Sequence, residues 1–218
     1  LIDCAVLIAI GINEQGKRQI LGCSVALSEA EVHWRNFLSG LKQRGLHGIE
    51  LFISDAHEGL KVARKAVFSG VPWQRCQFHL QQNAQAYVPK REMKTKVAEQ
   101  IRQMFDAPDR EDAQRLLDRF IERHEKNAPD LARWAQTAIP EGLEVFAFPA
   151  SQRKRLRTSN VLERVNREIK WRTRVVTLFP NTESCLRLVS AVLMEISEEW
   201  ETGRAYINMN PDDNEDTG

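Results

Sequence analysis

Two apolar runs at the start of the chain constrain the fold most, because a short polar turn separates them. The first is CAVLIAIGI at 4–12, the second is QILGCSVAL at 19–27, and NEQGKR lies between them. Continuous runs of this length that are rich in β-branched residues indicate buried strands. They fall short of the roughly 18 apolar residues that a membrane helix needs. The chain is therefore predicted to begin with a β-hairpin.

Helices and strands alternate in the next part of the chain. An apolar stripe that begins at Trp34 predicts a helix that ends at Gly45. The run IELFI at 49–53 predicts a strand, and the residues after it have helical periodicity. The segment WQRCQFHL at 73–80 predicts a short strand that enters a further helix. This alternation is typical of an α/β domain.

The pattern changes to helical periodicity alone from about 84 to 157. Three apolar stripes predict three helices there, and LEVFAF at 143–148 is the one doubtful strand. Two more helices are predicted at 158–172 and at about 182–201, ahead of a short acidic tail that should be disordered. An all-helical block therefore interrupts the α/β domain.

The bulk composition places limits on the class of protein. The chain has 218 residues, of which 42% are hydrophobic and 28% charged, enough for a sizeable core under a charged surface. No secretory pattern opens it, so a cytoplasmic, bacterial-type location without a membrane is expected. The four cysteines show no tight spacing and are expected to be reduced thiols, mostly buried: Cys4, Cys23, Cys76 and Cys185.

The net charge of +1 conceals a basic block at 153–174. That segment carries nine basic and two acidic side chains, so the rest of the chain is about −6. Such density favours a polyanionic partner such as DNA, although a solvated helix face explains it equally well. The basic residues are Arg153, Lys154, Arg155, Arg157, Arg164, Arg167, Lys170, Arg172 and Arg174.

Asp55 is the first candidate site residue, in the segment ISDAHEGL. It follows a predicted buried strand, and the carboxyl ends of strands are where α/β domains build their sites. The spacing of Asp55 and Glu58 also fits a helix capping box. His57 could share the Asp55 side or stand exposed at the helix start.

Glu163, which lies inside the basic block, could likewise have either a structural role or a role as a metal ligand. It could cap a helix together with Asn160 or pair with Arg167 four residues later. A metal ion bound to a phosphate would equally favour this neighbourhood, since carboxylates hold Mg²⁺ and basic side chains hold a nucleic-acid backbone. Lys170 lies two turns after Glu163 on the same face and could contact the same strand.

Cys76 and His79 have the spacing of half a zinc site. A structural zinc site needs four ligands, and the sequence has no second close pair. Cys76 is therefore interpreted as a packed side chain and His79 as a hydrogen-bonding group. The chain also lacks a P-loop, a dinucleotide glycine motif and a G-x-S-x-G elbow, which weakens NTPase, dehydrogenase and hydrolase interpretations.

Taken together, four segments resemble the mutator-type family of bacterial insertion-sequence transposases. They are AVLIAIGINEQGKRQILG, ISDAHEGLKVA, VPWQRCQFHLQQN and TSNVLERVNREIKWRTRVVTLFPN. The resemblance implies a ribonuclease H-like mixed sheet with an all-helical insertion and a D-D-E triad that holds two Mg²⁺ (or Mn²⁺) ions. It also implies cutting and joining of double-stranded DNA, both transposon ends and target, by a homo-oligomer assembled with DNA.

The resemblance assigns individual residues as well. It matches Asp55 to the second aspartate, Glu163 to the glutamate and Lys170 to the basic residue one heptad later, and it matches Cys76 and His79 to the family's C-x-x-H pair. The family's first aspartate lies on a strand that precedes the first strand here, and Asp3 does not replace it. The chain is thus expected to lack that first strand, one metal ligand and the upstream DNA-binding region, and to be inactive alone.

The implied organisation is a ribonuclease H-like core at 1–83, a helical insertion at 84–157, the last core helices at 158–203 and a disordered tail at 204–218. The eight basic residues of the block other than Lys170 are then candidates for DNA binding, and Lys170 is a supporting residue of the site, as are His57, Cys76 and His79. Two alternatives stay open. One is a non-catalytic DNA-binding or assembly module derived from a transposase, and the other is a metal-dependent nuclease that cuts without joining.

Overall fold

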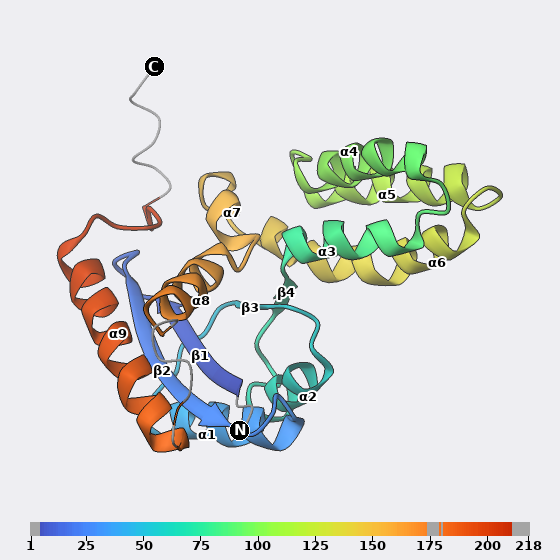
Figure 1. Cartoon of the computed structure of the whole chain (residues 1–218). Helices are drawn as coiled ribbons and strands as arrows, with labels where there is room; N and C mark the ends of the chain where they lie inside the picture. The colour runs from blue at the N-terminus through green and yellow to red at the C-terminus, as the bar shows by residue number, and fades with distance from the viewer. Residues whose placement is uncertain (1–4, 174–178, 180, 211–218) are drawn as a thin grey trace. The chain divides into compact units, whose positions relative to one another are not determined.

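The structure is a computed structural model that describes residues 5–173, 179 and 181–210 (Figure 1). The chain divides into two compact units. The hairpin unit consists of Leu1–Glu50, Ala56–Val71 and Asn160–Gly218. The helical unit consists of Leu51–Asp55 and Pro72–Ser159.

The hairpin unit is built on the predicted hairpin. Strand β1 (Ala5–Ile12) pairs antiparallel with β2 (Arg18–Ala26), and the register shifts between Ala9 and Ile10. In the turn, the Asn13 side chain accepts hydrogen bonds from the backbone N–H of Gln15 and Lys17. Gly16 has a φ of 72°, a conformation that favours glycine. The local turn chemistry therefore fixes this hairpin, as the sequence predicts.

Helices pack on both faces of the hairpin. On one face, α8 (Asn160–Thr173) and α9 (Thr182–Thr202) form an apolar core with Ile8 and the partly buried Cys23. On the other, α1 (Glu31–Gln43) approaches Gly22, where an added Cβ would lie 3.1 Å from Leu41. Neighbouring residues on a strand point to opposite faces. Both faces thus have helices packed on them, which explains why the two strands are apolar along most of their length rather than strictly alternating.

Two further segments complete the hairpin unit. Helix α2 (Glu58–Val67) packs against α1. After α9, the backbone N–H groups of Tyr206 and Ile207 donate to the carbonyl of Gly16, and Ile207 is buried. The start of the predicted acidic tail therefore contacts the hairpin turn, while 211–218 lie outside the described residues.

The helical unit has a small parallel sheet and a helical core. Strand β3 (Phe52–Ser54) pairs with β4 (Trp73–Arg75), which leads into α3 (Gln77–Ala84). The core is formed mainly by α3 with three longer helices, and α7 (Ala150–Leu156) follows them. The longer helices are α4 (Lys94–Phe105), α5 (Arg110–His124) and α6 (Pro129–Ala138). Residues 84–157 are all described and contain no strand, and LEVFAF forms a 3₁₀ turn at Glu144–Ala147.

The sheet arrangement differs from the prediction. The resemblance implies a mixed sheet, but the described strands form two separate two-stranded sheets, and the strand predicted at 49–53 is not in the sheet of the hairpin. Only Phe52–Ser54 is a strand in this segment, and its hydrogen bonds go to β4 and its flanks, for example Phe52 N–H to the Pro72 carbonyl at 2.9 Å. Among the described helices, none combines the length and apolarity that crossing a membrane requires.

Candidate active site

The parallel pairing of β3 with β4 sets the position of Asp55. Ser54 lies opposite Arg75, so Asp55 and Cys76 leave the same end of the two strands. The Cys76 N–H donates to the Ser54 carbonyl at 2.9 Å and continues the ladder by one bond. Helix α3 begins at Gln77, with Cys76 as its N-cap residue, so His79 lies in its first turn.

Three potential ligands meet at this strand end. An Asp55 carboxylate oxygen contacts Nδ1 of His79, and the nearest ligand atoms of Asp55, Cys76 and His79 all lie within 4.8 Å of one another. Cys76 is fully buried, whereas the Asp55 side chain is 51% exposed. The backbone N–H of Ser159 donates to Cys76 Sγ at 3.4 Å. The carboxylate is therefore open to solvent on one side and held by an imidazole on the other.

Buried amide side chains fix the loop that carries this cluster. Gln74 is fully buried, and its amide donates to the Gly142 carbonyl and accepts from the Val145 N–H, both at 2.8 Å. Gln77 donates to the same Gly142 carbonyl at 2.8 Å. These bonds join β4 and the start of α3 to the turn after α6, so the cluster stands on a rigid support. Gln74 could not be recognised from the sequence, because no local pattern separates a buried glutamine from an exposed one.

Asp55 is not the N-cap residue of α2, so the structure does not support the interpretation of Asp55 as a helix cap. The N-cap residue of α2 is His57, and its side chain makes no capping hydrogen bond. His57 belongs to the hairpin unit, where its Nε2 lies 3.5 Å from a carboxylate oxygen of Glu29. The structure thus joins Asp55 to Cys76 and His79 and gives His57 a different partner.

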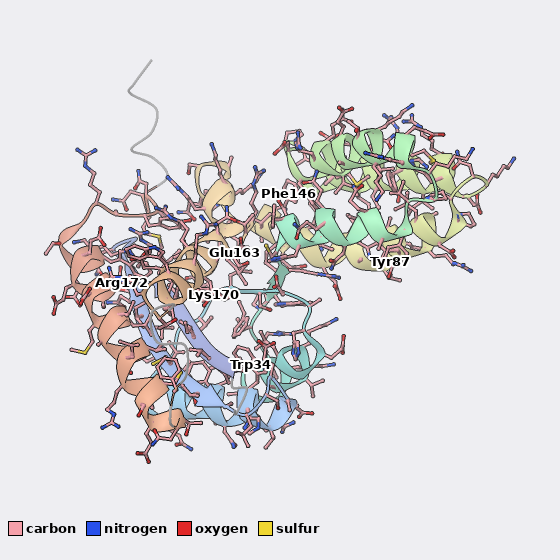
Figure 2. The ribbon with its side chains drawn as sticks, viewed as in Figure 1. Trp34, Tyr87, Phe146, Glu163, Lys170 and Arg172 are labelled. Carbon is pink, nitrogen blue, oxygen red and sulfur yellow. The ribbon has the colours of Figure 1, made fainter. Side chains whose placement is uncertain are left out.

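Glu163 and Lys170 lie on α8 in the hairpin unit (Figure 2). Val165 and Ile169 bury the inner side of this helix, which leaves Glu163 half-buried and Lys170 exposed. Seven residues, about two helical turns, separate Glu163 from Lys170, so the two side chains share one face. Because Asp55 belongs to the helical unit and Glu163 to the hairpin unit, their convergence stays a prediction.

Several arginines of the basic block are held by the protein itself. Arg153 donates to the carbonyls of Phe148 and Pro108 at 2.8 and 2.7 Å, and Arg157 pairs with Asp106 at 2.6 Å. Arg172 pairs with Glu168 at 2.7 Å and contacts Glu195. The hydrogen bond to Glu195, then that to Glu168, raises the pKa of Arg172.

The other described basic residues of the block face solvent. Lys154 and Arg155 are exposed on α7, and Arg164, Arg167 and Lys170 are exposed on α8. Arg174 lies outside the described residues. Among the described residues of the predicted DNA-binding set, Arg153, Arg157 and Arg172 therefore contact other parts of the protein, and Lys154, Arg155, Arg164 and Arg167 are exposed.

The donor atoms of the cluster differ in how well they suit the Mg²⁺ that the sequence leads us to expect. Mg²⁺ prefers oxygen ligands, and Asp55 is the only oxygen donor among the three. Its exposed carboxylate has several lone-pair sites, so contact with His79 leaves acceptor capacity for a cation. Asp55 therefore fits as one ligand of Mg²⁺ or Mn²⁺, and the remaining ligands must come from elsewhere. Asp55, Cys76 and His79 would together suit a softer metal such as zinc, but three ligands within 4.8 Å define no closed site.

The comparisons with known proteins agree on one family. The family model described as "Transposase, Mutator family" matches residues 2–203. The transposase for insertion sequence element IS406 of Burkholderia multivorans is 59% identical over 211 residues, covering 97% of this chain and 54% of that protein. The transposase for insertion sequence element ISRM5 of Rhizobium meliloti is 42% identical, covering 94% of this chain and 51% of that protein.

A third relative, with lower sequence identity, is also a transposase. The transposase for insertion sequence element IS1081 of Mycobacterium tuberculosis is 38% identical over 209 residues, covering 96% of this chain and 50% of that protein. This chain belongs to the Mutator family of transposases, which confirms the resemblance seen in the sequence. It spans about half the length of these curated relatives.

Proposed function

We propose that this chain is the catalytic region of an insertion-sequence transposase with a ribonuclease H-like fold and a D-D-E metal site. The observation that carries the proposal is the meeting of Asp55 with His79 and Cys76 at the end of two parallel strands. A half-exposed carboxylate fixed by a histidine at such a strand end is suited to hold a cation against a phosphate. Membership of the Mutator family supports the reaction class.

In this proposal, Asp55 and Glu163 hold two Mg²⁺ ions together with a further aspartate. Such ions stabilise the attacking and leaving oxygens of an in-line displacement at a phosphodiester. His79 orients the Asp55 carboxylate through the contact described above. Lys170, exposed on the same face of α8 as Glu163, neutralises a phosphate of the bound strand. The nucleophile is first water and then a DNA 3′-hydroxyl, with no covalent enzyme intermediate.

Duplex DNA, as transposon end and as target, is the proposed partner, and a homo-oligomer brings two ends together. Arg164, Arg167 and Lys170 supply affinity that does not depend on sequence, because phosphate contacts position a duplex without reading its bases. Lys154 and Arg155, which are exposed on α7 of the helical unit, are further candidates for phosphate contacts.

The proposal is tested with this chain inside its complete reading frame, using an oligonucleotide strand-transfer assay with transposon-end DNA and Mg²⁺. Asp55→Asn and Glu163→Gln should each abolish cutting and joining while leaving DNA binding intact. Glu58→Gln, three positions after Asp55, is the matched control and should keep activity. Cutting without joining by the wild-type protein would favour a nuclease, and DNA binding without either reaction would favour a non-catalytic module.

A further inference from the structure

Trp171 is the most exposed of the large hydrophobic side chains among the described residues. It is 68% exposed, although tryptophan is mostly buried in folded proteins. It lies near the end of α8, a helix that buries Val165 and Ile169 on its inner side. Trp171 therefore contributes little to the core and presents its ring to solvent.

Three described neighbours of Trp171 on the helix surface are basic, and the acidic Glu168, three residues before it, pairs with Arg172. Arg164 and Arg167 precede Trp171 by seven and four residues, which places all three side chains on one face. Lys170 is adjacent, and all three cations are exposed. Arg172 differs, because Glu168 and Glu195 engage it. The outer face of α8 is thus a line of cations that ends in an aromatic ring.

This combination matches one kind of ligand. Cations along a helix track a phosphate backbone, and an exposed aromatic ring offers a stacking surface to a base outside the duplex. A paired base in an intact duplex has both faces covered by its neighbours, so stacking on a side chain requires an unpaired or extruded nucleotide.

We propose that Trp171 stacks on an unpaired nucleotide base of DNA whose phosphates Arg164 and Arg167 hold. Eight residues of helix separate Trp171 from Glu163, a distance of about 12 Å along the axis. At about 3.4 Å per nucleotide, the stacked base lies about three to four nucleotides from a phosphate beside Glu163. The inference rests on the proposed function, and it adds that the protein prefers DNA that is distorted close to the cleavage point.

The test compares a labelled duplex that carries one unpaired nucleotide with the same duplex fully paired, by fluorescence anisotropy over a salt series. The chain should bind the duplex with the unpaired nucleotide about tenfold more tightly, as expected for one base stacked on an aromatic ring. Trp171→Ala should remove this preference, leave affinity for the paired duplex within about twofold and keep the salt slope. Trp171→Phe should retain most of the preference.

The matched control is Met194→Ala on α9, because Met194 is also exposed, at 65%, but is followed by Glu195 rather than by cations. Met194→Ala should change neither the affinity for the paired duplex nor the affinity for the duplex with the unpaired nucleotide. Thermal melting of every variant checks that it is folded. A 2-aminopurine at the unpaired position should report stacking with wild-type protein and none with Trp171→Ala.

Equal loss of affinity for both duplexes in Trp171→Ala, or an unchanged preference, would overturn the inference while leaving DNA binding intact. A change from dimer to monomer in Trp171→Ala without any effect on the 2-aminopurine signal would show that a second copy of the chain covers the ring, and would overturn it too. Absence of salt-dependent DNA binding by the wild-type chain would overturn the proposed function itself.

Discussion

The Asp55 carboxylate contacts the imidazole of His79, although 24 residues and a whole helix separate them in the sequence. The contact arises because β3 and β4 run parallel and end together, and because α3 starts at once after Cys76. A histidine that holds a carboxylate from the first turn of a helix restricts the directions in which the carboxylate can bind a cation.

His79 is therefore expected to act as a positioning residue for Asp55. His79→Ala should lower the strand-transfer rate of the complete protein by about 10- to 100-fold, as is typical when a residue that orients a metal ligand is lost. His79→Asn, whose amide N–H can replace Nδ1–H, should recover much of the rate. Equal activity of the two variants, or a loss matched by a loss of folding, would contradict a positioning role.

Arg164 and Arg172 offer a matched pair on one helix. Arg164 is exposed, whereas Arg172 is engaged by Glu168 and Glu195. Arg164→Ala should reduce the slope of log K against log salt for duplex binding by about 0.9, the value of one phosphate contact. Arg172→Ala should leave this slope unchanged. A larger slope change for Arg172→Ala would mean that its ion pairs open when DNA binds.

Gln74 should be required for the stability of the helical unit. Gln74→Leu fills a similar volume but leaves the Val145 N–H without its partner in a buried region, which costs about 1–3 kcal/mol. The free energy of unfolding in urea should fall by that amount. Gln82→Leu on the exposed side of α3 is the control and should change it little. An unchanged stability for Gln74→Leu would show that the amide network is not needed.

His124 should give the protein a stability that depends on pH. It is buried in α5, with its Nε2 3.1 Å from Gln100 Oε1, and burial lowers its pKa below the ordinary value of 6.5. As the pH drops, the His124 imidazole is therefore protonated earlier in the unfolded chain than in the folded chain. The free energy of unfolding should consequently fall as the pH drops through about 6.5. The contribution of neutral His124 to the stability is fully present above a pH of about 6.5.

Urea titrations at pH 7.5, 6.5 and 5.5 measure this effect. His124→Gln should make the loss of stability between pH 7.5 and 5.5 shallower than in the wild type. His47→Gln, at an exposed histidine, is the control and should keep the wild-type dependence. Parallel curves for His124→Gln and the wild type would show that His124 does not titrate differently on unfolding.

Local signals were sufficient to predict most elements. The hairpin follows from two apolar runs and a turn whose Asn13 and Gly16 act within a few residues. The helices follow from periodicity, as in α8, which was predicted at 158–172 and in which the apolar Val165 and Ile169, four residues apart, are buried. The partner of β3 could not be predicted, because a strand of three residues carries too little pattern to select β4 over the hairpin.

The candidate site was predicted only in part for the same reason. The sequence indicated Asp55, Cys76 and His79 as candidate residues. It could not decide whether Asp55 caps a helix or acts as a metal ligand, because the contacts of Asp55 with Cys76 and His79 exist only in the folded chain. The roles of the arginines depend on remote acids: Asp106 is 51 residues from Arg157, and Glu195 is 23 residues from Arg172. No spacing rule in the sequence reveals such partners.

The central claim is that Asp55 and Glu163 bind the same metal centre. Iron(II) replaces Mg²⁺ at such centres and, with ascorbate and peroxide, cleaves the nearby polypeptide backbone. The measurement maps these cuts by mass spectrometry on the chain within its complete reading frame, bound to transposon-end DNA. The account predicts cuts next to both Asp55 and Glu163, competed by Mg²⁺ and lost together in either Asp55→Asn or Glu163→Gln. Cuts at only one of the two positions, or cuts at Glu163 that survive Asp55→Asn, would contradict it.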